Sequence, residues 1–222
     1  MFRTPFILPL FFPALTWRVN TIEKELFLTF DDGPIPGPTE FVLETLKKFD
    51  AKATFFCIGD NIKKYPEIAR RIVADNHQIA NHTFNHLKGW GTSTEKYVSN
   101  VALCQKEIDN LLPGSDEQVV EDGGLKKSLF RPPYGRIRSK QINALTKQHR
   151  IVMWDVLTSD YSQSLSPGDC LRGTISAARP GSIIVFHDSL KAQSNMTYAL
   201  PRCIEHFSNL GYQFKALPNS SF

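Results

Sequence analysis

The sequence alternates short apolar runs with longer segments of helical periodicity, and this alternation is what most constrains the fold. Seven runs of apolar or β-branched residues are predicted to be strands: 26–30, 53–58, 78–81, 128–130, 151–155, 182–186 and 212–217. Between most of them, apolar residues recur every three or four positions, which predicts helices at 41–49, 62–73, 97–112, 137–149 and 196–210. Strands that alternate with helices along the whole chain are typical of an α/β fold with a parallel sheet.

Two helix-start signals agree with this interpretation, because proline stands at the beginning of helical segments at Pro38-Thr39 and at Ser166-Pro167. The periodicity is compatible with an incomplete β/α barrel and with an open doubly wound sheet. No linker-like segment divides the 222 residues, so we expect one domain, with residues 1–25 as an apolar N-terminal segment packed on it. The stretch 113–127 is rich in Gly, Asp and Glu and is predicted to be a surface loop.

Charge and cysteine content exclude several classes of protein. Lys and Arg number 26 against 22 Asp and Glu, which gives a net charge of only +4, and no Lys/Arg-rich run is present. We therefore expect no nucleic-acid partner. The four cysteines form no Cys-x-x-Cys pair, which argues against a structural zinc knuckle. Isolated cysteines are typical of small buried residues in a reducing compartment, which favours a cytoplasmic location.

An apolar run at 6–15 follows Arg3 and resembles part of a signal peptide. Pro9 and Pro13 interrupt this run, no small-residue cleavage site follows it, and it has about half the length that a bilayer requires. We therefore expect no transmembrane span. The run packs on the domain or contacts a membrane surface, and secretion is the alternative.

Side chains suited to catalysis or metal binding directly follow five of the predicted strands. They are Asp31 and Asp32 in the first cluster, His82 and His86 in the second, Arg131 to Gly135 in the third, Asp155 and Asp160 in the fourth, and His187 and Asp188 in the fifth. In a parallel α/β fold, the carboxyl ends of the strands lie at the same edge, which is where such folds place their sites. The sequence therefore predicts one site built from all five clusters.

Each cluster taken alone also has a purely structural explanation. Asp-Asp-Gly-Pro at 31–34 is a good turn sequence, and Arg-Pro-Pro-Tyr-Gly at 131–135 suits a rigid bend. His82 and His86 could lie on the surface, and His187 could be a buried histidine bonded to a carbonyl group. The common position after strands favours function. In addition, histidines four residues apart bring two imidazoles onto one metal, for which a carboxylate is the natural third ligand.

In this order, the clusters resemble the motifs of the NodB-homology polysaccharide deacetylases, carbohydrate esterase family 4. The resemblance is carried by Thr-Phe-Asp-Asp-Gly-Pro at 29–34, His-Thr-Phe-Asn-His at 82–86, Arg-Pro-Pro-Tyr-Gly at 131–135, the segment 154–161, and Val-Phe-His-Asp at 185–188. It extends over residues 26–217, nearly the whole chain. It implies an α/β fold of the irregular (β/α)7 barrel type, with the site at the C-terminal ends of the parallel strands.

The resemblance also implies a role for each matching residue. The divalent-metal ligands are Asp32, His82 and His86, with zinc as the expected metal and cobalt or nickel as alternatives. The catalytic residues are Asp31 as general base, His187 as general acid, Arg131 orienting Asp31, and Asp160 supporting His187. On the substrate side, the residues are Pro133 and Tyr134, whose backbone amide donates to the oxyanion, and Val185 in the acetyl pocket.

The fourth motif departs from the family pattern, which is Asp-x-x-Asp-Trp. Here 157–161 reads Leu-Thr-Ser-Asp-Tyr, so Leu157 stands in place of the first Asp and Tyr161 replaces Trp. Asp160 is therefore the expected partner of His187, with Asp155 as a second candidate. The altered aromatic residue bears on the substrate pocket more than on the chemistry.

These features together predict a metal-dependent hydrolase that removes N-acetyl groups from an amino-sugar glycan, such as a GlcNAc polymer, a chitooligosaccharide or peptidoglycan, and releases acetate. One alternative is a hydrolase of the same family that acts on a lipid-linked sugar, an O-acetyl group or another C–N amide. A second alternative is a carbohydrate-binding protein that kept the metal and lost turnover. The sequence leaves the identity of the glycan, the native metal and the oligomeric state open.

Overall fold

The computed structural model describes residues 2–111 and 127–218. Apart from Lys127, the surface loop predicted at 113–127 therefore lies outside the described residues. The strands are β1 (Glu25–Asp31), β2 (Ala53–Cys57), β3 (Gln78–Asn81), β4 (Ser128–Phe130), β5 (His149–Ile151), β6 (Val156–Leu157), β7 (Ile183–His187) and β8 (Gln213–Phe214). The helices are α1 (Ile7–Phe11), α2 (Pro38–Lys48), α3 (Gly59–Lys64), α4 (Pro66–Ala74), α5 (Thr94–Leu111), α6 (Ser139–Leu145), α7 (Pro167–Ala177) and α8 (Gln193–Asn209), with a short 3₁₀ turn η1 (Pro133–Gly135).

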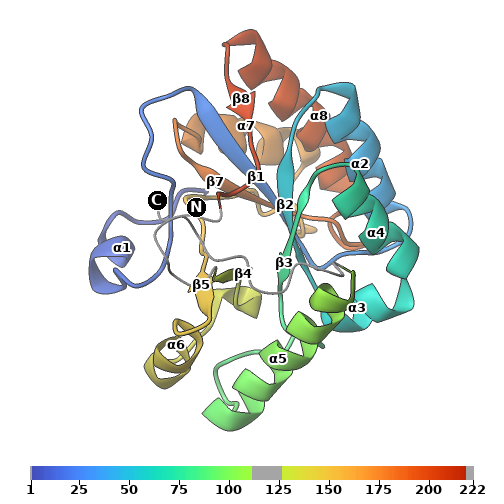
Figure 1. The fold of residues 1–222 in the computed structure, drawn as a ribbon. Helices are drawn as coiled ribbons and strands as arrows, with labels where there is room; N and C mark the ends of the chain where they lie inside the picture. The colour runs from blue at the N-terminus through green and yellow to red at the C-terminus, as the bar shows by residue number, and fades with distance from the viewer. Residues whose placement is uncertain (1, 112–126, 219–222) are drawn as a thin grey trace.

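The strands form one curled sheet in the order β5-β4-β3-β2-β1-β7-β6, and β8 pairs with β1. All paired strands are parallel. Figure 1 shows the helices around the outside of this sheet, which is open between β5 and β6. The prediction of an α/β fold of irregular barrel type is confirmed, and the parallel pairing brings the carboxyl ends of the strands to one edge.

Two predicted elements differ in the structure. The strand predicted at 151–155 ends at Ile151, and β6 begins only at Val156. Between them, the chain leaves β4 and pairs with the N-terminal segment, where Met153 donates its N–H to the carbonyl of Thr16. The helix predicted at 62–73 is two helices, because Pro66 has no N–H for a continuing helix and begins a new one.

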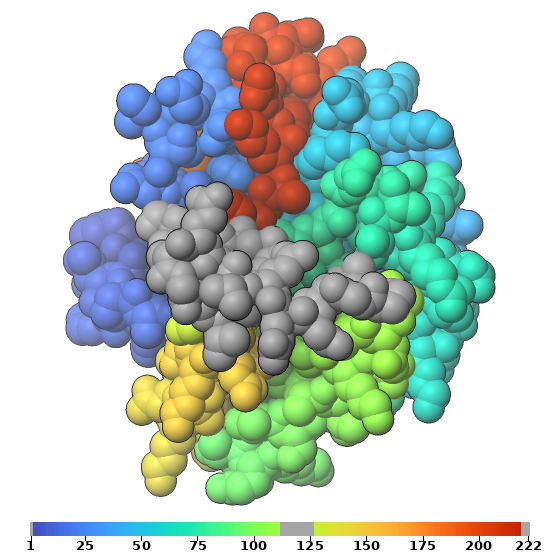
Figure 2. Space-filling model, viewed as in Figure 1, coloured from blue at the N-terminus to red at the C-terminus, as the bar shows by residue number. Residues whose placement is uncertain are grey.

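The N-terminal segment fills the gap between β5 and β6. Arg3 pairs with Val156 of β6, and Thr16 pairs with Val152 just after β5. Leu15 is buried, whereas Phe6, Leu10 and Phe11 are 83%, 72% and 70% exposed. In Figure 2 the start of this segment forms the left edge of the molecule. No helix within the described residues is long and apolar enough to span a membrane. The single-domain organisation stays a prediction.

The alternation of side chains along β1 decides what faces the site. Leu28 and Phe30 belong to the apolar core under the helices, where the ring of Phe30 stacks on that of Phe55 at 5.0 Å. Phe27 packs in a separate cluster. Because side chains alternate along a strand, Thr29 and Asp31 share the face of Phe27. A strand buried on both faces thus ends in a buried carboxylate that points into the barrel.

Candidate metal-dependent active site

The neighbouring carboxylates of Asp31 and Asp32 point in different directions because the strand ends between them. Asp31 is the last residue of β1, and Asp32 has a φ of 84°, in the left-handed region. The turn therefore begins at Asp32 itself, within the turn sequence at 31–34. Asn61 fixes it by donating from Nδ2 to the carbonyl oxygen of Asp32 at 2.8 Å. Asp31 stays in the barrel, and Asp32 turns towards the loop after β3.

Asp32, His82 and His86 converge on one point. One ligand atom from each lies within 4.8 Å of the others, which is a group that could hold a metal ion. Asp32 Oδ1 is 3.2 Å from His86 Nε2 and 3.7 Å from His82 Nε2. This oxygen is buried and has no hydrogen-bond partner. Because a buried polar atom without a partner is costly, a cation between these three side chains accounts for the arrangement.

The protonation of His82 also suits metal binding. Its Nδ1 donates to the carbonyl oxygen of Arg131 at 2.8 Å, which leaves the lone pair of Nε2 directed towards Asp32. Burial lowers the pKa of His82 to about 4, although the charge of Asp31 opposes this effect. The imidazole is therefore neutral near pH 7, as a ligand must be.

The charge state of Asp32 follows from its neighbours. Burial alone would raise its pKa, but the contact with His86 and the charges of His187 and His82 outweigh burial and hold the pKa well below the usual value. Asp32 is therefore an ionised carboxylate beside two imidazoles. One anionic oxygen and two imidazole nitrogens form a donor set typical of divalent transition metals.

Asp31 is held by Arg131, which reaches across the barrel from the end of β4. Arg131 Nη1 donates to Asp31 Oδ1 at 2.6 Å and to the hydroxyl of Thr29 at 2.8 Å. The same guanidinium donates to the carbonyls of Val152 and Met153, and it lies 4.0 Å from the ring of Phe56. Arg131 is fully buried. Oδ1 of Asp31 is thus fixed by Arg131. The other carboxylate oxygen, Oδ2, lies 4.0 Å from His82 Nε2.

His187 lies opposite Asp31, because β7 pairs with β1 and places these two residues in register. Asp160 binds it twice: His187 Nδ1 donates to Asp160 Oδ1 at 2.7 Å, and the backbone N–H of His187 donates to Oδ2 at 2.7 Å. Burial would lower the pKa of His187, but the carboxylates of Asp160, Asp32 and Asp31 outweigh it and raise the pKa to about 9. This imidazole is therefore protonated near pH 7.

Asp155, the second candidate for this role, lies elsewhere. Its carboxylate accepts hydrogen bonds from Ser182 at 2.7 Å and from Arg179 at 3.2 Å. It ties the chain before β6 to the start of β7, which is a structural task. The ring of Tyr161, the residue that departs from the family pattern, packs edge-on against His187 with the centroids 4.9 Å apart.

The predicted substrate-side residues lie around the metal-binding group. Pro133 is buried, and Tyr134 has a φ of 60° and is 61% exposed. The ring of Tyr134 lies 4.6 Å from that of His86. Val185 is fully buried on β7, two residues before His187 and therefore on the same face of the strand. The roles of these residues in substrate binding stay predictions.

Asp188, to which the sequence assigned no role, lies under the site. It accepts the N–H of Gly33 on Oδ1 at 3.0 Å and the hydroxyl of Thr39 on Oδ2 at 2.6 Å. Burial raises its pKa to about 8, with the charge of Asp32 adding to the effect and the Thr39 bond opposing it. The sequence signals for Asp188 were its place next to His187 and its position in the motif at 185–188. Asn195, which donates to the carbonyl of Asp160 at 2.9 Å, had none.

Comparison with known proteins agrees with this geometry. Residues 18–154 match the family model described as polysaccharide deacetylase. A peptidoglycan-N-acetylglucosamine deacetylase of Bacillus cereus is 31% identical over 89% of this chain and 68% of its own length. A chitooligosaccharide deacetylase of Azorhizobium caulinodans is 34% identical over 77% of both chains. A crystal structure of a peptidoglycan N-acetylglucosamine deacetylase has a TM-score of 0.83 at 29% identity, and covers 97% of this chain and 95% of its own.

The family match extends over more than half of the chain and includes Asp31, Asp32, His82, His86 and Arg131. His187 and Asp160 lie beyond this match. The fold and the three potential metal ligands are consistent with the match. So are the two ion pairs beside them, Asp31 with Arg131 and Asp160 with His187. The chain belongs to the polysaccharide deacetylase family.

Proposed function

We propose that this protein is a metal-dependent hydrolase that removes N-acetyl groups from polymers of N-acetylglucosamine and releases acetate. One observation carries the proposal: the potential ligands Asp32, His82 and His86 are flanked by a buried carboxylate, Asp31, and a protonated imidazole, His187. An amide needs both a base that activates water and an acid that protonates the departing amine. The site has one of each, on adjacent strands.

Asp31 is the base in this mechanism. Arg131 donates to one oxygen of its carboxylate, which leaves Oδ2 to accept a proton from the attacking water. The four groups that accept from Arg131 fix the guanidinium, so the carboxylate is held in place before substrate binds. A positioned base of this kind accelerates hydrolysis by about 100- to 10,000-fold.

His187 is the acid. Its pKa of about 9 keeps the proton on the ring at neutral pH, and the bond from Nδ1 to Asp160 directs Nε2 towards the site. When the carbon–nitrogen bond breaks, Nε2 gives its proton to the amine, which is too basic to leave as an anion. Asp160 then favours return of the proton from solvent.

Asp32, His82 and His86 would hold the metal. Zinc suits a set of two imidazoles and one carboxylate, with cobalt and nickel as alternatives. A divalent cation bound there supplies a Lewis acid for the acetyl carbonyl and lowers the pKa of a bound water towards about 7. The backbone N–H of Tyr134, in the left-handed turn beside His86, is the proposed second donor to the oxyanion.

The substrate class rests on the relatives, which are named for peptidoglycan and for chitooligosaccharides. The test is release of acetate by zinc-loaded protein from N-acetylglucosamine oligomers and from peptidoglycan glycan strands, with His187→Gln as the matched variant. Acetate from either polymer, reduced by about 100-fold or more in His187→Gln, supports the proposal. Equal release by both proteins, or none from any amide or ester substrate, contradicts it.

A second candidate, hydrolysis of a lipid-linked sugar at a membrane surface, is favoured by the exposed side chains of Phe6, Leu10 and Phe11 around α1. Exposed apolar groups of this kind insert into the interfacial region of a bilayer. Activity on a lipid-linked N-acetyl sugar in vesicles, lost in Phe6→Ser/Phe11→Ser, would favour this candidate over the first.

The cytoplasmic location stays a proposal, supported by the four cysteines, which are all buried and free: Cys57, Cys104, Cys170 and Cys203.

A binding protein without turnover is the less favoured alternative. Binding a glycan needs neither the buried pair of Arg131 and Asp31 nor the double contact between His187 and Asp160. Buried charges are costly to assemble, so their presence on both sides of the potential ligands supports catalysis.

A further inference from the structure

Two loops extend the site on the side of His86. The first follows β3 and carries Trp90, and the second follows β4 and carries Tyr134 and Arg136. The ring of Tyr134 lies 4.6 Å from the ring of His86, and the guanidinium carbon of Arg136 lies 5.1 Å from the centre of the Trp90 ring. Tyr134 is 61% exposed and Trp90 is 54% exposed. These three side chains are called the ridge below: Tyr134 lies beside the metal-binding group, and Arg136, two residues further along the same loop, lies over Trp90.

Hydrogen bonds join the two loops that carry the ridge. Gln141 is fully buried; it donates to the carbonyls of Gly89 and Thr92 in the first loop and accepts the N–H of Arg138 in the second. The backbone N–H of Gly89 donates to the carbonyl of Arg136 at 3.2 Å, and a Cβ at Gly89 would meet that oxygen at 2.4 Å. The two loops therefore touch backbone to backbone, and the ridge needs little reordering when a ligand binds.

The indole of Trp90 is itself oriented. Its Nε1–H donates to the carbonyl of Ile137 at 3.2 Å, which ties the ring to the second loop. Arg136 is exposed and lies over that ring. A guanidinium stacked on an aromatic ring keeps its N–H groups at its edge, where they can donate two parallel bonds to one carboxylate.

The surroundings of the ridge carry positive charge. Residues 82–93 and 131–141 contain no Asp or Glu. Their exposed cations are Lys88, Arg136, Arg138 and Lys140. None of the four makes an ion pair with any described residue. Exposed cations that pair with no acidic side chain in the described ranges 2–111 and 127–218, close to exposed aromatic rings, suit a ligand that is both a sugar chain and an anion.

We propose that the ridge binds the sugar units next to the residue being deacetylated, and that it selects glycans that carry carboxylate groups over neutral glycans. Tyr134 and Trp90 stack on sugar rings, and Arg136 binds the carboxylate. This inference rests on the proposed deacetylase function and goes further, because it distinguishes between the anionic and the neutral polymers for which the relatives are named.

The test compares one glycan in two charge states. Strands of an N-acetylated amino-sugar polymer that bears carboxylates are used intact or after amidation of the carboxyl groups, and kcat/KM for acetate release is measured for both. We expect wild-type protein to prefer the intact strands by about tenfold or more, because amidation removes the charge that strengthens the hydrogen bonds from Arg136. The preference should decrease as salt is added.

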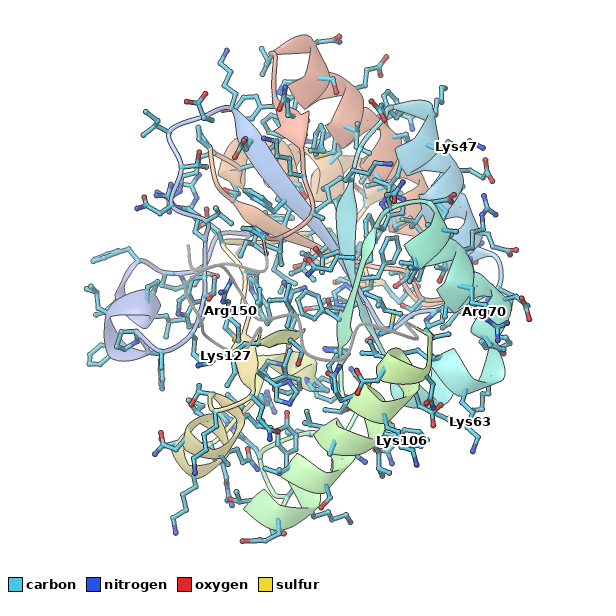
Figure 3. All side chains as sticks on the ribbon, viewed as in Figure 1. Lys47, Lys63, Arg70, Lys106, Lys127 and Arg150 are labelled. Carbon is cyan, nitrogen blue, oxygen red and sulfur yellow. The ribbon has the colours of Figure 1, made fainter. Side chains whose placement is uncertain are left out.

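Arg136→Gln should abolish most of this preference, and Arg136→Lys, which keeps the charge but loses the planar fork, should retain part of it. Trp90→Ala should raise KM for both forms of the strand. The matched control is Lys47→Gln, which removes a positive charge elsewhere and should keep the preference of the wild type for intact strands. Lys47 lies in the last turn of α2, and Figure 3 shows it on the outer helices with Lys63, Arg70 and Lys106. Because α2 runs from the carboxyl end of β1 back towards the start of β2, this charge is remote from the ridge.

Two results overturn the inference: equal kcat/KM of wild-type protein for the two forms, or a preference in Arg136→Gln as large as in the wild type. Thermal unfolding of each variant shows whether it is folded. If no strand yields acetate, the proposed function fails by itself. The ridge is then tested by equilibrium binding of the intact and amidated strands to wild type and Arg136→Gln, where equal affinities for both strands would contradict it.

Discussion

Asp160 accepts two hydrogen bonds from the same residue, His187: one from the ring Nδ1 and one from the backbone N–H, both at 2.7 Å. The carboxylate therefore fixes the position of the ring and also its proton. This double contact holds His187 although Leu157 stands where the family pattern resembled by the sequence has its first Asp. Because this carboxylate raises the pKa of His187, a substitution at Asp160 should change the charge of the imidazole in a measurable way.

The first prediction concerns the dependence of activity on pH. Because the pKa of His187 is about 9, kcat of the wild type should decrease as pH rises through about 9, when the acid loses its proton. In Asp160→Asn the same decrease should occur at a lower pH, because the carboxylate that raises the pKa is gone. A pH–rate profile of both proteins measures this shift. Profiles that coincide would mean that His187 is not the acid.

The same pair should stabilise the fold in a defined pH range. The pKa of His187 is raised above the value of about 6.5 expected in the unfolded chain. The stabilisation is therefore fully present below about pH 6.5 and is lost as pH rises through about 9. Tm of the metal-free protein, measured from pH 6 to pH 10, should fall more steeply in the wild type than in Asp160→Asn. Parallel curves would contradict the assignment.

Removing the buried cation of Arg131 should strongly destabilise the fold. Arg131 is fully buried and donates to Thr29, Asp31, Val152 and Met153. Arg131→Met leaves the carboxylate of Asp31 buried without its partner, which costs about 3–5 kcal/mol in the free energy of unfolding. Urea denaturation measures the loss.

The matched control for this change is Arg70→Met, because Arg70 forms an exposed ion pair with Glu67 at 2.8 Å on α4. Exposed pairs contribute little, so the midpoint of unfolding should hardly change. If Arg131→Met were as stable as Arg70→Met, the buried network around Asp31 would not hold the site together.

Asp188 should act on the site through the turn at Gly33. Asp188→Ala leaves the buried N–H of Gly33 and the hydroxyl of Thr39 without an acceptor, which costs about 2–4 kcal/mol and should lower kcat as well. Asp188→Asn keeps an oxygen for Gly33 and should recover most of both losses. Urea denaturation and acetate release are measured together. Equal behaviour of the Ala and Asn variants would show that hydrogen bonding by Asp188 does not position the turn.

Metal binding should depend on His82 and not on histidine in general. His82→Ala removes a buried nitrogen ligand, so the bound metal measured by elemental analysis should fall by about tenfold or more at the same free metal concentration. His206→Ala on α8, an exposed position outside the site, should bind metal like the wild type. Metal should also raise Tm of the wild type and of His206→Ala but not of His82→Ala. An equal rise in all three would contradict the site.

Much of the site was predictable because it depends on local order along the chain. Asp31 and His187 are the last residues of their strands, and His82 and Arg131 directly follow theirs. Parallel pairing alone brings these strand ends together. Contacts that depend on remote pairing were not predictable. Val152 still donates its N–H to the carbonyl of Phe130 in β4, but Met153 donates to Thr16 of the N-terminal segment, so the strand predicted at 151–155 ends early.

The supports beneath the site show the same limit. Gln141 joins the loops after β3 and β4, and Asn195 of α8 holds Asp160. Each is a polar residue in an amphipathic helix, where nothing in the sequence distinguishes it from a solvent-exposed side chain. Their roles follow only from the packing of the helices against the sheet.

The most direct test of the proposed mechanism combines metal content with acetate release in Asp31→Asn. Because Asp32, His82 and His86 are the proposed metal ligands and Asp31 is the proposed base, metal binding and water activation should be separable. The variant should retain about one divalent ion per chain and lose about 100-fold or more in kcat on an N-acetylglucosamine polymer. A metal-loaded Asp31→Asn protein with unchanged kcat would contradict the mechanism.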